Sequence, residues 1–69
     1  MNKTTKTQPQ PEWKDASAVK PLKDDTVLAH VKDPVSGKMY LTSSIWDGKR
    51  WNNKVVYFKG WPVIEWRPM

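Results

Sequence analysis

Tryptophans and cations alternate closely in the middle of this sequence of 69 residues. Trp46, Lys49, Arg50 and Trp51 all fall in one short segment. Aromatic ring faces stack on nucleobases, and Lys or Arg side chains neutralise phosphates. We therefore interpret this segment as a binding site for an anionic ligand, either a nucleotide or a nucleic acid. The full set of candidate ligand-binding residues is Trp46, Lys49, Arg50, Trp51, Lys54, Lys59, Trp61 and Arg67.

The same tryptophans must also supply the hydrophobic core, because a domain this small has few other large side chains. The chain contains five Trp, two Tyr and one Phe. We expect Trp13, Trp66 and one member of the Trp46 and Trp51 pair in the core. Trp61 lies between a glycine and a proline, and we expect it to be partly exposed.

Residues that could catalyse a reaction are present but are not grouped. A nucleophile needs a base within hydrogen-bond reach, and the base needs a third group to orient it. His30 has no such partner nearby in the sequence, and the serines and carboxylates are scattered. The pattern predicts that the protein is not an enzyme.

Metal and cofactor sites are also not expected. The chain has no cysteine and one histidine, and the adjacent Asp24 and Asp25 are more typical of a turn than of a metal site. Its three glycines are isolated, so no phosphate-cradling loop is predicted.

The composition predicts one small domain with a preference for anionic partners. Twelve Lys and Arg against seven Asp and Glu give a net charge of +5. Residues 1–11 read as a disordered tail, and residues 12–69 as a single small β domain. Without Lys3 and Lys6 of the tail, the net charge falls to +3. No apolar run approaches the ~20 residues that span a bilayer, so we expect no membrane partner, signal peptide or anchor.

Two strands and a turn are predicted before the tryptophan segment. Residues 26–32 alternate, with Val27, Ala29 and Val31 on one face. Residues 33–38 combine Asp, Pro, Ser and Gly, which is typical of a turn. The second strand covers residues 39–46, with Met39, Leu41 and Ile45 facing away from Trp46. One of these two faces should be covered and the other available.

The second half of the chain is expected to continue the sheet. Asp47-Gly48 predicts a two-residue type I′ hairpin that pairs Trp46 with Lys49 and Ser44 with Trp51. Residues 52–54 read as a loop or bulge, and residues 55–59 and 63–67 as strands. The predicted fold class is all-β: a small antiparallel sheet or partly open barrel of about four short strands in a meander. At most one helical turn is expected, near the N-terminus.

The tryptophan spacing resembles a family of small uncharacterised phage and prophage proteins. These proteins have an opening Trp, a strand of the V-L-V type, a central W-x-G-x-x-W hairpin and a closing W-x-P ending. The residues that carry the resemblance are Trp13, Val27, Leu28, Trp46, Gly48, Trp51, Trp66 and Pro68. The resemblance implies a phage or prophage origin and a compact β domain, without an established activity. A phage-type binding protein that sequesters or masks its ligand in the host cytoplasm, in host takeover or counter-defence, is the resulting hypothesis.

A second hypothesis is a protein-interaction module that inhibits a host protein through an exposed Trp patch or a sheet edge. Weak salt dependence and no affinity for nucleotides would distinguish it from the first. A four-stranded sheet leaves two edges unpaired, so the chain could also form a homodimer. A structural role in a virion is a third alternative.

Overall fold

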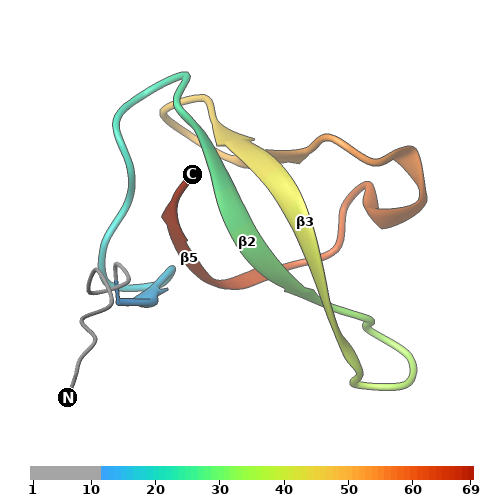
Figure 1. Cartoon of the computed structure of the whole chain (residues 1–69). Helices are drawn as coiled ribbons and strands as arrows, with labels where there is room; N and C mark the ends of the chain where they lie inside the picture. The colour runs from blue at the N-terminus through green and yellow to red at the C-terminus, as the bar shows by residue number, and fades with distance from the viewer. Residues whose placement is uncertain (1–11) are drawn as a thin grey trace, which may run out of the picture.

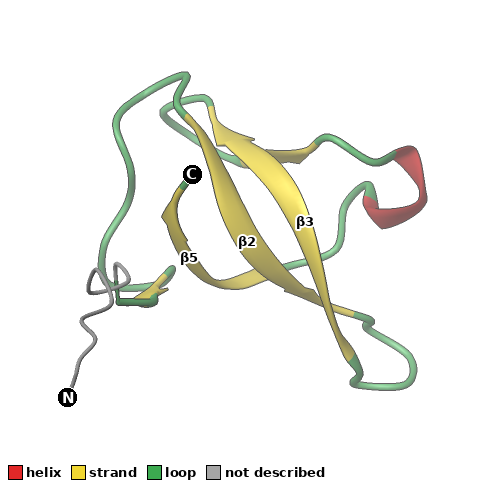
Figure 2. Ribbon diagram, in the orientation of Figure 1, coloured by secondary structure: helices red, strands yellow, loops and turns green. Residues whose placement is uncertain are grey.

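A five-stranded antiparallel sheet organises the chain (Figures 1 and 2). The computed structural model describes residues 12–69, and the predicted disordered tail lies outside the described residues. The strands stand in the order β1-β5-β2-β3-β4. This arrangement confirms the all-β prediction. The elements are β1 (Lys14–Asp15), β2 (Thr26–Lys32), β3 (Met39–Trp46), β4 (Trp51–Asn53), the 3₁₀ helix η1 (Val56–Phe58) and β5 (Val63–Pro68).

The predicted meander is wrong in its last step. Strands β2, β3 and β4 follow one another as hairpins, but β5 pairs with β2 on the other side of the sheet. Along its other edge, away from β2, β5 also pairs with β1, and there Lys14 is opposite Trp66. A strand of two residues has no detectable alternation, and β1 is therefore a fifth strand that the pattern could not predict. The helical turn is η1, which lies late in the chain rather than near the N-terminus.

The central strands β2 and β3 have the predicted faces. Val27 is opposite Ser44 and Ala29 is opposite Thr42, and all four of these residues are buried. We call this side of the sheet the inner face. On the opposite, outer face Leu41 is 57% exposed. The covered face is therefore the one that carries Trp46.

The core is small and centres on Trp66. Ala16, Val27 and Ala29 are buried together with Trp66, and Trp51 and Val63 pack against them. The Trp66 indole N–H donates a hydrogen bond to the Val19 carbonyl at 2.8 Å, which ties the segment after β1 to the core. Trp66 and Trp51 thus have the predicted role.

The prediction of Trp13 as a core residue is wrong. It precedes Lys14, the partner of Trp66, so it lies on the outer face. There its ring stacks on His30 with 4.2 Å between ring centroids, and the Arg67 guanidinium lies 5.0 Å from its centroid. Trp13 is half-buried in this position.

The β3–β4 hairpin has a different register from the predicted one. Trp46 is opposite Trp51 and Ser44 is opposite Asn53. A type I′ turn needs positive φ at both central residues. Only Gly48 has it, at +98°, and Asp47 does not. The partner of each β3 residue therefore moves by two residues, from Lys49 to Trp51 for Trp46. Residues 47–50 connect the strands, and Asn52 and Asn53, which were predicted as loop, belong to β4.

The predicted strand at residues 55–59 is also wrong, because η1 occupies this segment. Since β5 must reach β2 on the far side of β3, residues 54–62 have to cross the sheet rather than extend it. We call this segment the crossover. It passes over the inner face, where the rings of Phe58 and Trp61 contact Tyr40.

Candidate nucleotide-binding groove

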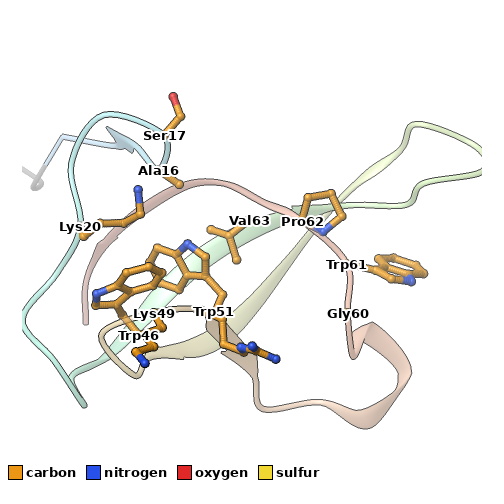
Figure 3. A pocket seen from close by; sticks show the side chains of 11 residues that line it. Ala16, Ser17, Lys20, Trp46, Lys49, Trp51, Gly60, Trp61, Pro62 and Val63 are labelled. Atoms are coloured by element: carbon orange, nitrogen blue, oxygen red, sulfur yellow. The ribbon is translucent and has the colours of Figure 1, made fainter.

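An open groove of about 590 Å³ lies between the β3–β4 hairpin, the turn after β1 and the chain that enters β5 (Figure 3). We call it the tryptophan groove. Its volume is in the range of about 300–1,000 Å³ that is typical of small-molecule sites. The lining residues are Ala16, Ser17, Lys20, Trp46, Lys49, Arg50, Trp51, Gly60, Trp61, Pro62 and Val63.

Two indoles form the aromatic wall of the groove. Trp46 and Trp51 are directly opposite on adjacent strands, and their ring centroids are 5.3 Å apart with 58° between the planes. Cross-strand aromatic pairs of this kind stabilise a hairpin. Both side chains are only partly buried, so ring surface remains accessible. Figure 3 shows the pair at the centre of the groove.

Three cations accompany the indoles. Lys20 places its Nζ 5.4 Å from the Trp46 ring centroid, and Lys49 and Arg50 belong to the hairpin loop. Within residues 12–69, no Asp or Glu is among the lining residues. The groove therefore combines accessible aromatic surface with positive charge only.

The carboxylate of the hairpin loop, Asp47, is hydrogen-bonded within its own loop. Its Oδ1 accepts hydrogen bonds from the backbone N–H groups of Arg50 at 2.7 Å and Lys49 at 2.8 Å. These bonds, the one from Arg50 first, lower the pKa of the Asp47 carboxyl from its ordinary value of 3.8. Asp47 consequently stays ionised at neutral pH and fixes the backbone that carries both loop cations.

The structure brings together part of the predicted site. Trp46, Lys49, Arg50, Trp51 and Trp61 line the tryptophan groove. The Trp61 ring points away from the indole pair in Figure 3, and it packs instead with Phe58 at a centroid distance of 5.0 Å.

The remaining predicted cations lie elsewhere. Lys59 lines a second cavity together with Arg50 and Trp51. Lys54 lines neither of these two cavities. Arg67 is on the outer face beside Trp13, since it alternates with Trp66 along β5.

Lys20 and Ser17 are groove residues that the sequence did not reveal. They belong to the irregular segment after β1, which has no strand or helix periodicity. The hydrogen bond from Trp66 to Val19 and the buried Pro21 hold this segment in place. The signal that could have found Lys20 is the proline after it, which fixes the segment as extended.

An aromatic cluster stands beside the groove. It consists of Tyr40, Tyr57, Phe58 and Trp61, whose rings lie 5.0 to 5.7 Å apart in five pairs. Tyr57 is 73% exposed. The cluster packs Phe58 and Trp61 of the crossover against Tyr40 of β3 and leaves Tyr57 at the surface.

The outer face holds the histidine. His30 is opposite Glu65, and its Nδ1 lies 2.8 Å from a Glu65 carboxylate oxygen. His30 therefore does have a partner, one that is distant in sequence. The hydroxyls of Ser17 and Ser44 donate to Asp15 and Asn53 instead. Among residues 12–69, no serine is hydrogen-bonded to His30.

Within 12–69, no three His, Cys, Asp or Glu side chains come together as a metal site would require. No helix in this part of the chain is long and apolar enough to cross a membrane.

Comparison with protein-family models, with curated proteins and with solved structures finds no match for this chain. The resemblance to phage proteins therefore stays a prediction, and the groove itself is the observation from which a function can be argued.

Proposed function

We propose that the protein binds a nucleotide unit, free or within a single-stranded nucleic acid, in the tryptophan groove. The observation that carries the proposal is the meeting of the indole pair with Lys20, Lys49 and Arg50 around one cavity that no described carboxylate lines. An anionic ligand without an aromatic part would leave the two indoles unused. An uncharged aromatic ligand would leave the three cations unused.

The geometry gives each part of a nucleotide a partner. A base stacks on the accessible face of Trp46 or Trp51, a contact worth about 1–3 kcal/mol per base. Its phosphate is neutralised by Lys49 and Arg50 of the hairpin loop. The Arg50 guanidinium can donate bidentate hydrogen bonds to the phosphate oxygens. The hairpin register preorganises the two indoles, and the Asp47 hydrogen bonds preorganise the backbone of the loop that carries Lys49 and Arg50. This preorganisation lowers the entropic cost of binding.

The biological role that fits this activity is sequestration. The site supports binding: its serine, Ser17, donates its hydroxyl to the Asp15 carboxylate, and no histidine lines the groove among the described residues. The phage resemblance adds a setting in which the protein masks a nucleotide signal or nucleic acid in the host cytoplasm. This setting is part of the proposal.

The test is a titration of the protein with a mononucleotide and with a short oligonucleotide at low salt. Binding is measured by the quenching of tryptophan fluorescence. Changing both Lys49 and Arg50 to Ala should weaken binding by roughly tenfold or more, because charged hydrogen bonds to phosphate are lost. The matched control is Lys32→Ala with Lys38→Ala, which removes the same charge from the exposed end of β2 and from the β2–β3 turn. Unchanged affinity in the Lys49 and Arg50 variant, and also after Trp51→Ala is added, would contradict the proposal.

A complementary measurement needs no assumed ligand. Protein purified from bacterial cells at low salt is examined for excess absorbance at 260 nm, and small molecules released by heat are identified by mass spectrometry. A released nucleotide or oligonucleotide supports the proposal and identifies the ligand class.

A second candidate function is suggested by the aromatic cluster. Tyr57 and Val56 are 73% and 83% exposed at the tip of the crossover, and aromatic residues are common at protein–protein hot spots. In this alternative the protein inhibits a host protein through the cluster. Co-purification of one host protein, lost in both Tyr57→Ala and Trp61→Ala and insensitive to salt, would favour it over nucleotide binding.

A further inference from the structure

A second cavity of about 420 Å³ adjoins the tryptophan groove along the sheet edge. We call it the edge groove. The two cavities have Arg50, Trp51 and Gly60 in common, so they lie on either side of the same stretch of chain. The edge groove is lined by Arg50, Trp51, Asn52, Asn53, Val56, Lys59 and Gly60.

The walls of the edge groove come from β4 and the crossover. β4 is the edge strand of the sheet, so the backbone groups on its outer side have no strand partner. Asn53 fixes the crossover against β4: its amide nitrogen donates to the carbonyls of Phe58 and Trp61, and its Oδ1 accepts from the Ser44 hydroxyl. The cavity is therefore supported by side-chain hydrogen bonds and does not depend on a chance gap between loops.

The charge of the edge groove repeats that of the tryptophan groove. Lys59 and Arg50 are its ionisable lining residues, and no Asp or Glu lines it in the part of the chain that the structure describes. Trp51 and Val56 are the large apolar residues of its lining. The same chemistry that recognises one nucleotide is thus present twice, side by side.

We propose that the two cavities hold two consecutive nucleotides of one strand, with the linking phosphate at Arg50. This inference rests on the proposed function and makes it more specific, since it identifies a strand rather than a mononucleotide as the ligand. Arg50 lines both cavities, and its planar guanidinium can donate two hydrogen bonds to one phosphate. Trp51 also lines both cavities, so the two nucleotides lie on either side of this residue. Lys59 then neutralises the phosphate on the far side of the second nucleotide.

The experiment compares thymidine 5′-monophosphate, a thymidine dinucleotide with a 5′ phosphate and a thymidine hexanucleotide in the same fluorescence titration of the full chain. The dinucleotide should bind about tenfold tighter than the mononucleotide or more, because a second base and phosphate are engaged. The hexanucleotide should add only a small further gain. A continued steep rise with length would overturn the two-nucleotide site in favour of a longer track.

The residue test uses Lys59→Ala, with Lys54→Ala as the matched control because Lys54 is an exposed lysine of the same crossover that lines neither cavity. Lys59→Ala should weaken dinucleotide binding by about fivefold and leave mononucleotide binding unchanged. The control should change neither. Near-ultraviolet circular dichroism verifies that both variants are folded.

The outcomes separate this inference from the function on which it rests. If the mononucleotide and dinucleotide bind equally well and Lys59→Ala has no effect on either, the edge groove is not a nucleotide site, although the tryptophan groove still is. If no nucleotide binds at all, both proposals are wrong.

Discussion

At the scale of single residues, Asp47 connects the sequence to the shape of the groove. Its carboxylate accepts backbone hydrogen bonds from Arg50 and Lys49, and these bonds stabilise the ionised form and lower its pKa. The folded protein therefore binds this proton less readily than the unfolded chain does. By linkage, the contribution of Asp47 to stability is fully present above the unfolded pKa near 3.8. It is lost as the pH falls through the lower folded value.

Asp47→Asn tests this linkage. The Asn side chain keeps an acceptor oxygen but cannot be protonated in this range, so stability at neutral pH should change little. The loss of stability between pH 4 and pH 2, approximately, should become shallower than in the natural chain. Asp15 and Asp33 have lowered pKa values with the same sign, so a residual acid dependence should persist. Urea unfolding at a series of pH values measures the effect, and parallel curves for the two proteins would contradict it.

Trp66 is the residue on which the core depends most. It is 5% exposed, and its indole N–H donates to Val19. Trp66→Phe removes the hydrogen bond, leaves the Val19 carbonyl without that donor and opens a small cavity, so it should destabilise the fold by about 2–4 kcal/mol. The comparison is Trp13→Phe, which keeps an aromatic ring on His30 at the outer face and should cost less. Urea unfolding of both variants checks the order, and equal losses would show that the outer stack matters as much as the core.

At the scale of elements, the crossover depends on Asn53. This one side chain makes three hydrogen bonds, to Ser44, Phe58 and Trp61, and so links β3, β4 and the aromatic cluster. Asn53→Ala should cost about 2–3 kcal/mol, because two carbonyls and a hydroxyl lose their partner. The neighbouring Asn52→Ala removes a single exposed contact to Asp47. It should lower the free energy of unfolding by about 0.5 kcal/mol at most. Thermal unfolding with near-ultraviolet circular dichroism measures both, and similar losses in the two variants would mean that Asn53 does not hold the crossover.

The long elements were predictable from the sequence and the short ones were not. β2 and β3 contain enough alternating positions to reveal their faces, and Asp33 with Gly37 marks the turn between them. β1 and β4 contain two and three residues, too few for a pattern. Residues 55–59 have strand propensity, but the need to cross to β2 overrides it. Local preference is a weak guide where the topology forces a connection.

The candidate site shows the same division. Trp46, Lys49, Arg50 and Trp51 lie on one hairpin, so their proximity follows from the sequence even though the register does not. Lys20 reaches the groove only because tertiary contacts fold back an irregular segment. Arg67 was assigned to the site by charge alone, and strand alternation places it on the opposite face.

At the scale of the whole molecule, charge determines how binding should respond to salt. The full chain has a net charge of +5, and residues 12–69 retain +3 of it. With Lys20, Lys49 and Arg50 at phosphates, the logarithm of the oligonucleotide affinity should fall with the logarithm of salt concentration with a slope of about −2. Lys20→Ala should reduce the slope by about 0.7, and Lys38→Ala should not change it. Titrations at several salt concentrations give the slope, and a value near zero would favour the protein-interaction alternative.

The position of β5 has a consequence for how the protein is made. It is the last of the described strands to be synthesised, yet it stands between β1 and β2 in the sheet. The β2–β3–β4 hairpins leave the ribosome before β5, and one edge of β2 remains unpaired until β5 has also left it. Pairings between residues distant in sequence slow folding, and unpaired strand edges promote aggregation. We therefore expect the nascent chain to be most vulnerable to aggregation and proteolysis just before β5 emerges.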